Sequence, residues 1–376
     1  MNVPVFTRDS RLILFAPHPD DESLGCGIAL HRAVSAGATI RVVYATDGEN
    51  NPWPQRWLFR KWRLNPSDCR RWGKWRRSEA LAALRTLGIS SAQVAFLGLP
   101  DQELSILLMG DCQSILDQLA AIVSDFCPTD LVIPSLSDTH PDHSALAVIL
   151  RLALNTTSAN HAETRIWHYI VHGRSPAFFD HAAPLSHSQA EEGAKRSAIA
   201  CHKTQLALSR RRFFGYAVRH EYFLRSTSPP RVIPDGSVVW MSRGEESLQL
   251  RLRMPTKILF SSDVSLLFLG RDIGGRLCSV RVAMPVRSQE IELVDLIERH
   301  SLAVASYRGD KFGGELEIPL AMFSVAEPVF LKIENRGWFF DEAGWIELPP
   351  PRPAFIEPFQ GHRELEYGCR LGLIVS

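Results

Sequence analysis

The sequence predicts an α/β fold: an open, mostly parallel Rossmann-like sheet with helices on both faces, followed by a smaller β-sandwich-like domain. The first half alternates short apolar or β-branched runs with longer helical patterns, which is typical of βαβ units. After residue 236 the pattern changes to short alternating runs separated by Gly, Ser, Asp or Pro, which indicates antiparallel strands. We therefore expect a first domain over residues 1–226 and a β-rich accessory domain over residues 237–376.

Each expected strand of the first half is followed by an expected helix. The strands are 11–16, 39–46, 93–99 and 130–135, and the helices are 24–37, 76–88, 112–126 and 144–154. Polar motifs stand where these strands end: PHPDDE at 17–22, TDGE at 46–49, LPD ending at Asp101, and SDTHPDH at 137–143. In open α/β sheets ligands bind beyond the carboxyl ends of the strands, so we expect these loops to converge on one rim.

The second half reads as a sandwich of short strands. Its clearest strands are 248–254, 265–270, 278–284 and 329–334, and the change of pattern falls at 226–236. A Pro-rich run at 348–355 is most simply a stiff connector.

Composition limits the class of protein. With 45% apolar and 22% charged residues, the chain suits one large folded domain plus a smaller one. The net charge of +1 gives no overall attraction to nucleic acid. The seven cysteines form no C-x-x-C pair, which argues against a disulfide framework and favours a reducing cytoplasm. No apolar signal core or run of 18 apolar residues occurs, so we expect no membrane-spanning segment.

Two motifs carry the candidate chemistry, HPDD at 18–21 and HPDH at 140–143. A catalytic zinc takes three His, Asp or Glu ligands and keeps one position open for water. His18, Asp21 and His143 supply that number, and the same set also accepts Fe²⁺ or Co²⁺. Asp20 then becomes the candidate general base, and His140 is placed to stabilise an oxyanion or to protonate a leaving amine.

With these motifs the chain resembles the PIG-L/LmbE family of zinc-dependent N-acetylglucosaminyl deacetylases. The resemblance covers residues 10–225, with further similarity at 46–49, 76–88, 96–101 and 195–205. It implies an LmbE-like catalytic domain that holds zinc with His18, Asp21 and His143. Asp20 would be the base, His140 its electrostatic or acid partner, and Asp101 a neighbour that tunes His140. The implied reaction removes the N-acetyl group from an N-acetylglucosamine-type glycoconjugate and releases acetate and an amino sugar.

Two alternatives stay open. In the first, the chain is an amidohydrolase that acts on another N-acyl group, such as that of an antibiotic or a metabolite. In the second, it is a non-catalytic protein that binds carbohydrate or a membrane. Both metal motifs are intact, which argues against the non-catalytic alternative.

Residues 51–77 combine tryptophans with basic residues. They hold Trp53, Trp57, Trp62, Trp72 and Trp75, together with nine Lys or Arg. Such a mixture suits sugar rings, phosphates or an anionic membrane surface. The alternative is a packed insertion with partly buried tryptophans. We hypothesise a rim that grips a large glycosylated substrate, with contact to a lipid-linked group or a membrane; nucleic acid is not expected, and an oligomer stays open.

Four further residues receive structural interpretations. His168, His172 and His202 are expected to pack or to face substrate, because the ligand set is already complete. Glu22 is expected to support the ligands or the first turn of the next helix.

Overall fold

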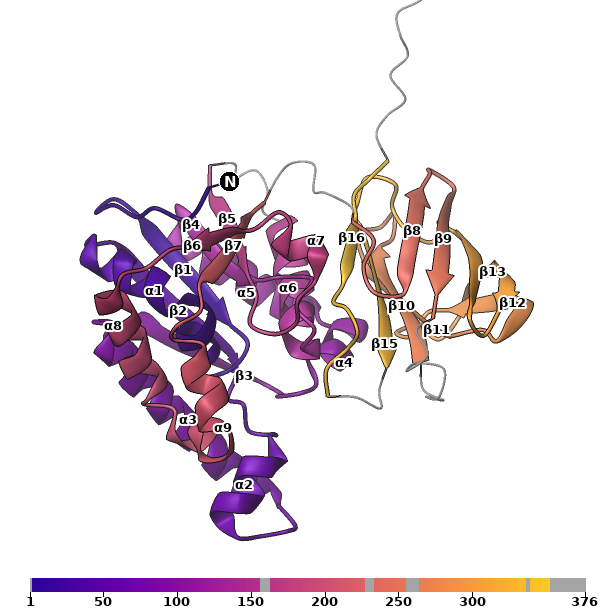
Figure 1. Cartoon of the computed structure of the whole chain (residues 1–376). Helices are drawn as coiled ribbons and strands as arrows, with labels where there is room; N and C mark the ends of the chain where they lie inside the picture. The colour runs from indigo at the N-terminus through magenta and orange to yellow at the C-terminus, as the bar shows by residue number, and fades with distance from the viewer. Residues whose placement is uncertain (1, 156–162, 227–232, 255–263, 336–338, 352–376) are drawn as a thin grey trace, which may run out of the picture.

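Figure 1 shows the computed structural model of the chain. It describes residues 2–155, 163–226, 233–254, 264–335 and 339–351, and the structural statements below concern these residues. The predicted run at 226–236 and the Pro-rich run at 348–355 lie partly outside them.

A seven-stranded sheet forms the centre of the first half, in the order β3-β2-β1-β4-β5-β7-β6. The five strands from β3 to β5 are parallel, and β7 pairs antiparallel with β5 and β6. The strands are β1 (Arg11–Ala16), β2 (Thr39–Thr46), β3 (Val94–Leu99), β4 (Asp130–Pro134), β5 (Arg165–Tyr169), β6 (Ala183–Leu185) and β7 (Glu221–Arg225). The predicted mostly parallel sheet is confirmed.

Strand order determines where the site can form. Leu12 to Ala16 of β1 are buried, as expected for a strand covered on both faces of a parallel sheet. From β1 the chain proceeds to β2 and β3 on one side, whereas β4 and β5 lie on the other side. The loops after β1 and β4 therefore flank the point where the strand order reverses, which is the ligand-binding position of such sheets.

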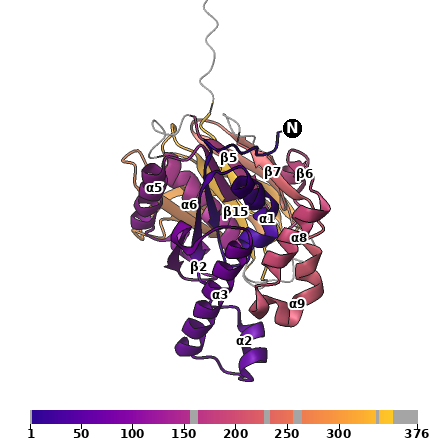
Figure 2. The same cartoon turned by 90° about the vertical axis from the view of Figure 1, so that its left-hand side faces the viewer.

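Helices cover both faces of this sheet (Figure 2). Residues of α1, α3 and α8 belong to one buried apolar core and residues of α4, α5 and α6 to the other. The helices are α1 (Asp21–Ser35), α2 (Pro52–Phe59), α3 (Pro66–Thr86), α4 (Leu104–Met109), α5 (Gln113–Phe126), α6 (Pro141–Asn155), α7 (Pro176–Phe179), α8 (Gln189–Ile199) and α9 (Lys203–Gly215).

Two antiparallel sheets make up the β-rich part, in the orders β11-β10-β15-β16 and β12-β13-β14-β9-β8. The strands are β8 (Val238–Arg243), β9 (Ser247–Arg253), β10 (Val264–Arg271), β11 (Leu277–Ala283), β12 (Arg287–Val294), β13 (Ser301–Asp310), β14 (Gly313–Pro319), β15 (Val329–Asn335) and β16 (Ile346–Leu348). Their inner faces share one apolar core, so the predicted sandwich is confirmed.

The four-stranded sheet is buried on both faces. Along β10, Leu266 and Phe268 point into the sandwich core, whereas Leu267 and Leu269 join the core of α4, α5 and α6. This alternation is the period of two expected for a strand. Because one apolar core contains residues from both halves, the division into domains at 226 and 237 stays a prediction.

Among the described helices, none has the length and apolar character needed to cross a bilayer.

Candidate active site

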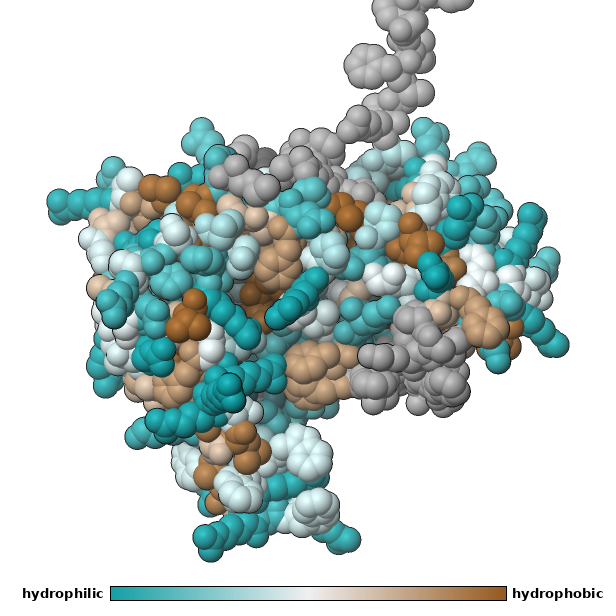
Figure 3. All heavy atoms as spheres, in the orientation of Figure 1, coloured by the Kyte–Doolittle hydropathy of each residue, from teal (hydrophilic) through white to brown (hydrophobic). Residues whose placement is uncertain are grey.

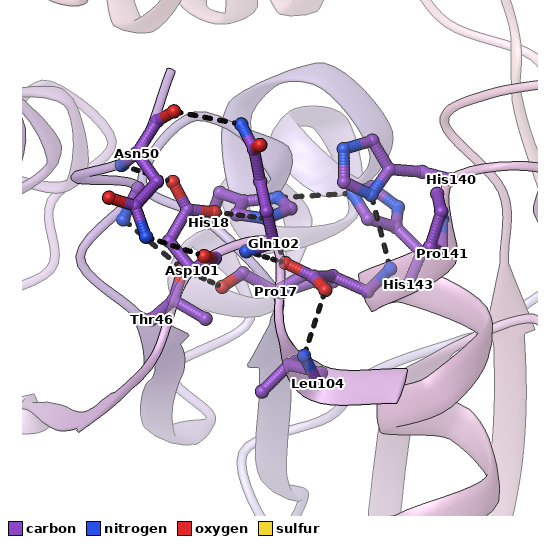
Figure 4. Close-up of polar contacts among 12 residues, drawn as sticks. Pro17, His18, Thr46, Asn50, Asp101, Gln102, Leu104, His140, Pro141 and His143 are labelled. Atoms are coloured by element: carbon purple, nitrogen blue, oxygen red, sulfur yellow. Dashed lines mark hydrogen bonds and ion pairs between the residues drawn. The ribbon is translucent and has the colours of Figure 1, made fainter. Parts of the chain in front are cut away.

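Three loops at the carboxyl ends of the parallel strands bring the predicted site residues together. His18, Asp20 and Asp21 lie between β1 and the first turn of α1. Asp101 follows β3, and His140 and His143 lie where the loop after β4 enters α6. Figure 4 shows His18, Asp101, His140 and His143 pointing into this common space.

The three predicted metal ligands present their donor atoms to one another. His18 Nδ1 lies 3.1 Å from Asp21 Oδ2 and 3.2 Å from His143 Nε2, and Asp21 Oδ2 lies 3.1 Å from His143 Nε2. Tetrahedral zinc with bonds of about 2.1 Å would hold its ligand atoms about 3.4 Å apart. Two imidazole nitrogens and a carboxylate oxygen at this spacing fit a catalytic divalent metal with an open position.

A carboxylate meets the second ring nitrogen of each of the two imidazoles. His143 Nδ1 lies 3.1 Å from Asp138 Oδ2. His18 Nε2 lies 3.1 Å from Asp101 Oδ1 and 3.2 Å from Asp142 Oδ2. Such partners fix the tautomer and the orientation of metal-binding histidines. Sequence analysis did not single out Asp138 and Asp142; their place inside the SDTHPDH motif is the signal that could have found them.

Backbone N–H groups hold both of these carboxylates in position. Asp138 accepts hydrogen bonds from three of them, those of His140, Val171 and His172. Asp142 accepts from two, those of Gln102 and Leu104. Asp142 therefore ties the loop after β3 to the loop after β4.

Negative charge dominates the buried site. Five carboxylates are buried there, those of Asp20, Asp21, Asp101, Asp138 and Asp142. Burial disfavours the charged form of His143, but Asp21 and Asp138 outweigh it and raise its pKa to about 9. Burial also opposes the charge of His18, yet Asp101, Asp142 and Asp21 raise its pKa well above the ordinary value. A bound dication would compensate this concentration of acidic groups.

Asp20 has the properties of a base that works near neutral pH. Burial raises its pKa to about 6, while Arg76 opposes this and Asp21 adds to it. Its Oδ1 lies 3.1 Å from Arg76 Nη2. Its φ of 151° is uncommon for a residue other than glycine, and its N–H is held by Glu22 Oε2 at 2.9 Å. A carboxyl group ionising near neutrality in a pocket is a candidate general base.

Arg76 is a site residue that sequence analysis missed. It is buried on α3, and its Nη1 and Nη2 donate to the carbonyl oxygens of Gly48 and Pro19, each at 2.9 Å. The guanidinium also occupies the space that a Cβ on Gly48 would need, and Gly48 has φ 62°. The glycine of the TDGE motif thus leaves the space in which the Arg76 guanidinium lies at the site.

His140 lies among other imidazoles and stays neutral. Its ring centroid is 4.8 Å from those of His18 and His143. Burial and the neighbouring His143 and His18 hold its pKa well below the ordinary value. Its Nδ1 accepts the Asp142 N–H at 3.3 Å, so a neutral ring carries its proton on Nε2 and can donate it to a substrate oxygen.

Asp101 contacts a different histidine from the one that the resemblance implied. Its Oδ1 faces His18 Nε2 rather than His140, and its Oδ2 accepts the Asn50 N–H at 2.7 Å. The N–H of the next residue, Gln102, is bound to Asp142, which fixes this turn with Asp101 directed at His18. In the structure Asp101 therefore orients His18.

The three histidines that were expected to pack or to face substrate lie in different environments. His172 lies beside the site with its ring centroid 4.9 Å from that of His143, and burial lowers its pKa to about 4. His202 Nε2 lies 3.0 Å from Glu22 Oε1. His168 Nε2 contacts Ser226 Oγ at 2.7 Å.

A cavity of about 300 Å³ opens onto these groups. It is lined by His18, Asp20, Asp21, Arg76, Asp101, His140 and His172 on its polar side. Other lining residues include Trp53, Leu208, Arg212, Phe213, Tyr216, Phe339 and Phe340. Its size is at the lower end of the range for small-ligand sites.

Helices α2 and α3 carry the tryptophan-rich segment; α2 lies at the tip of the projection at the bottom of Figure 1, and α3 leads from there back alongside α8 and α9. On this projection hydrophilic spheres lie beside hydrophobic ones (Figure 3). Trp72 is buried, as the packed-insertion alternative expects, whereas Trp53, Trp57, Trp62 and Trp75 are 43% to 75% exposed. Of these tryptophans Trp53 lines the cavity, so the segment reaches the rim of the site through α2.

Comparison with known proteins gives a match over the first half. Residues 13–154 match the family described as PIG-L: GlcNAc-PI de-N-acetylase. Two relatives carry the name 1D-myo-inositol 2-acetamido-2-deoxy-alpha-D-glucopyranoside deacetylase. The one from Mycobacterium avium is 30% identical over 146 residues, which are 35% of this chain and 47% of that protein. The one from Corynebacterium kroppenstedtii is 26% identical over 261 residues, 64% of this chain and 55% of that protein.

The chain thus spans about half the length of these relatives. A crystal structure of a conserved protein from Thermus thermophilus is 24% identical, covers 62% of this chain and 100% of its own, and superposes with a TM-score of 0.42.

Proposed function

Because residues 13–154 of this chain match the PIG-L family, we propose that the protein is a metal-dependent hydrolase that removes the N-acetyl group from an N-acetylglucosamine-type glycoconjugate. The observation that carries this proposal is the triangle of donor atoms from His18, Asp21 and His143 beside the buried carboxyl group of Asp20. The products are acetate and a free amino sugar.

His18, Asp21 and His143 would hold the metal, which we propose to be zinc, with Fe²⁺ and Co²⁺ as substitutes. When bound, such an ion supplies Lewis acidity that activates water and polarises the amide carbonyl group. Asp138, Asp101 and Asp142 orient the two histidines from behind.

The protein's own groups then move the protons. Asp20 accepts a proton from the attacking water, and Arg76 holds its carboxylate in position. His140 keeps its proton and donates an Nε2–H hydrogen bond to the amide oxygen as negative charge develops there. The protonated Asp20 then returns its proton to the amide nitrogen, so that the C–N bond breaks and the amino sugar leaves as a neutral amine. The second water proton stays on the acetic acid and passes to solvent as acetate is released.

Two features support an amino-sugar substrate. The names of the Mycobacterium avium and Corynebacterium kroppenstedtii relatives describe the deacetylation of an acetamido-glucopyranoside. The cavity has room for one sugar ring, and Trp53 and Arg212 at its lining suit ring stacking and anionic substituents.

We further propose that residues 51–77 contact the group linked to the sugar, such as a phosphate or a lipid. Arg56 lies over the rings of Trp53 and Trp62, which gives this segment a surface both aromatic and cationic. The cytoplasmic location and an oligomeric state stay predictions.

Acetate release from a substrate panel tests the function. The panel contains free, nucleotide-linked, inositol-linked and lipid-diphosphate-linked N-acetylglucosamine, each given to zinc-loaded protein. We expect release from at least one member and none from chelator-treated protein. Release of a longer acyl group but no acetate would favour the alternative amidohydrolase, and binding without release would favour the non-catalytic alternative.

A further inference from the structure

Residues 339–345, which precede β16, reach the candidate site from the β-rich part. The ring centroids of Phe339 and Phe340 lie 5.3 Å and 5.7 Å from that of His140. Phe340 also lies 5.1 Å from His172. Both phenylalanines line the cavity that holds Asp20 and Asp21. These residues lie outside the stretch that matches the family, so the family resemblance assigns them no role.

Backbone hydrogen bonds fix this segment onto the loop that carries Asp138 and His143. The N–H of Asp341 donates to the carbonyl oxygen of Thr139 at 2.9 Å, and the N–H of Trp345 donates to that of Leu136 at 2.8 Å. Between them, Gly344 lies so close to the carbonyl oxygens of Leu136 and Asp138 that a Cβ would have no room. The two loops are therefore held together by main-chain contacts.

A buried ion pair connects the same segment to β15, and the lysine of this pair also contacts α6. Lys332 Nζ on β15 lies 2.5 Å from Asp341 Oδ2 and 3.4 Å from Ser144 Oγ, and both charged residues are buried. Removing one partner of such a pair would leave an uncompensated buried charge. The contacts therefore favour one position of the segment.

The two phenylalanines differ from the polar lining in chemistry. Phe339 is 50% exposed and is one of the residues that line the cavity. Arg212 lies over Phe340 at 6.0 Å, and Leu208, Phe213 and Tyr216 continue the apolar lining. Aromatic side chains at such a place gain free energy when an apolar group covers them.

We propose that Phe339 and Phe340 form an apolar subsite beside His140, through which the β-rich part selects substrates that carry an apolar group. The group is either an extended N-acyl chain or an apolar substituent of the sugar, and both present hydrocarbon to the rings. The selection of substrates rests on the proposed hydrolase function, whereas binding of the apolar group does not.

Ligand binding tests the subsite without turnover. Calorimetry would compare the affinities of octyl and methyl N-acetyl-β-D-glucosaminide, and of N-hexanoyl- and N-acetylglucosamine, for the zinc-loaded protein and its variants. In one of these two pairs, we expect the wild-type protein to bind the more apolar ligand with about tenfold or higher affinity than its partner. The pair that shows the preference distinguishes the two sources of the apolar group.

Phe339→Ala and Phe340→Ala should each reduce that preference several-fold while leaving the affinity for zinc unchanged. Phe312→Ala is the matched control, because Phe312 is 55% exposed on the β-rich part and does not line the cavity. Wild-type preference retained by both variants, or no preference in the wild-type protein, would overturn the proposal.

Gly344→Ala tests the docking of the segment, with Gly193→Ala as control because a Cβ on Gly193 meets nothing within 4 Å. We expect Gly344→Ala to lose the preference as the phenylalanine variants do, and Gly193→Ala to keep it. A Gly344→Ala protein that keeps the full preference would show that the docked position is not required.

Kinetic constants separate this proposal from the proposed function. Hydrolysis with equal kcat/KM in the wild-type protein and both phenylalanine variants for apolar substrates would overturn the subsite and leave the hydrolase standing. Binding that depends on Phe339 and Phe340, without hydrolysis of any substrate, would support the subsite and contradict the hydrolase.

Discussion

At the scale of single residues, Asp20 is the group on which turnover should depend most. Its carboxyl group is buried, lies 3.1 Å from Arg76 and has a pKa raised to about 6. Asp20→Asn removes the proton acceptor but keeps the size and the polar contacts of the side chain. We expect kcat to fall by about 10²–10⁴-fold, the usual contribution of a general base.

Zinc content measured on the same Asp20→Asn sample should equal that of the wild-type protein, since Asp21 and not Asp20 belongs to the triangle of donor atoms. Turnover close to the wild-type rate would show that another group takes the proton.

His168 gives a prediction about pH and stability that is separate from the metal site. Burial, with a smaller effect of the charge on Arg151, lowers its pKa to about 4, against about 6.5 in the unfolded chain. Between these values the unfolded state binds a proton that the folded state does not. The stabilisation from a neutral His168 is therefore complete above pH 6.5 and is lost as the pH falls toward 4.

His168→Asn removes this dependence, so the difference in free energy of unfolding between the wild-type protein and the variant should fall as the pH drops from 7 to 4. Urea unfolding at several pH values measures it, and His220→Asn, at an exposed position, serves as control. A difference that does not change with pH would contradict the lowered pKa.

At the scale of elements, the projection formed by α2 and the residues that lead into α3 is expected to contact anionic surfaces. Trp57 and Trp62 are 67% and 75% exposed there, among nine Lys or Arg of residues 51–77. Exposed tryptophans with basic neighbours bind the interface of anionic bilayers. We expect the double variant Trp57→Ala, Trp62→Ala to lose most binding to vesicles that contain anionic lipid.

Co-sedimentation with anionic and with neutral vesicles measures this binding, with Trp240→Ala as the matched control because Trp240 is 44% exposed on β8. Equal binding of the wild-type protein and the double variant would show that Trp57 and Trp62 do not contribute to membrane binding.

Individual elements show how far sequence patterns predicted the fold. The continuous apolar runs gave β1 at its observed bounds and β4 within one residue, because strands buried on both faces leave little choice of register. Strand β12 was not among the strands singled out; it lies at the edge of its sheet and most of its side chains are exposed, so few apolar residues mark it. Helix α4 was missed because its six residues are too few for a period to show.

In the candidate site, too, the residues that could be predicted are those within a local sequence pattern. Residues inside the HPDD and HPDH motifs are close in sequence, and the strand order brings the two motifs together. Arg76 and Phe340 could not be found in this way, because they reach the site from α3 and from the segment after β15 through contacts between distant parts of the chain.

At the scale of the whole molecule, the first half and the β-rich part share a buried core. Leu267, Leu269 and Phe330 pack into the same cluster as α4, α5 and α6. Arg151 on α6 also pairs with Glu347 on β16 at 2.6 Å. Continuous packing of this kind favours a single cooperative unfolding transition.

Phe330→Ala should therefore lower the stability of the whole chain by about 3–5 kcal/mol, because Phe330 is fully buried in that core. Scanning calorimetry should show one transition shifted to lower temperature, whereas Phe312→Ala at an exposed turn should shift it little. Two transitions, of which one is unaffected by Phe330→Ala, would show that the two parts unfold independently.

The central claim is that a metal held by His18, Asp21 and His143 makes this molecule an amide hydrolase for acetamido sugars. Zinc titrated into chelator-treated protein, with bound zinc and released acetate measured on each sample, tests it most directly. We predict no release without metal, release that rises with the first bound equivalent, and weak binding with no release in His143→Ala. Acetate release by metal-free protein, or a full equivalent of zinc bound with no release from any N-acetylated sugar, would contradict the account.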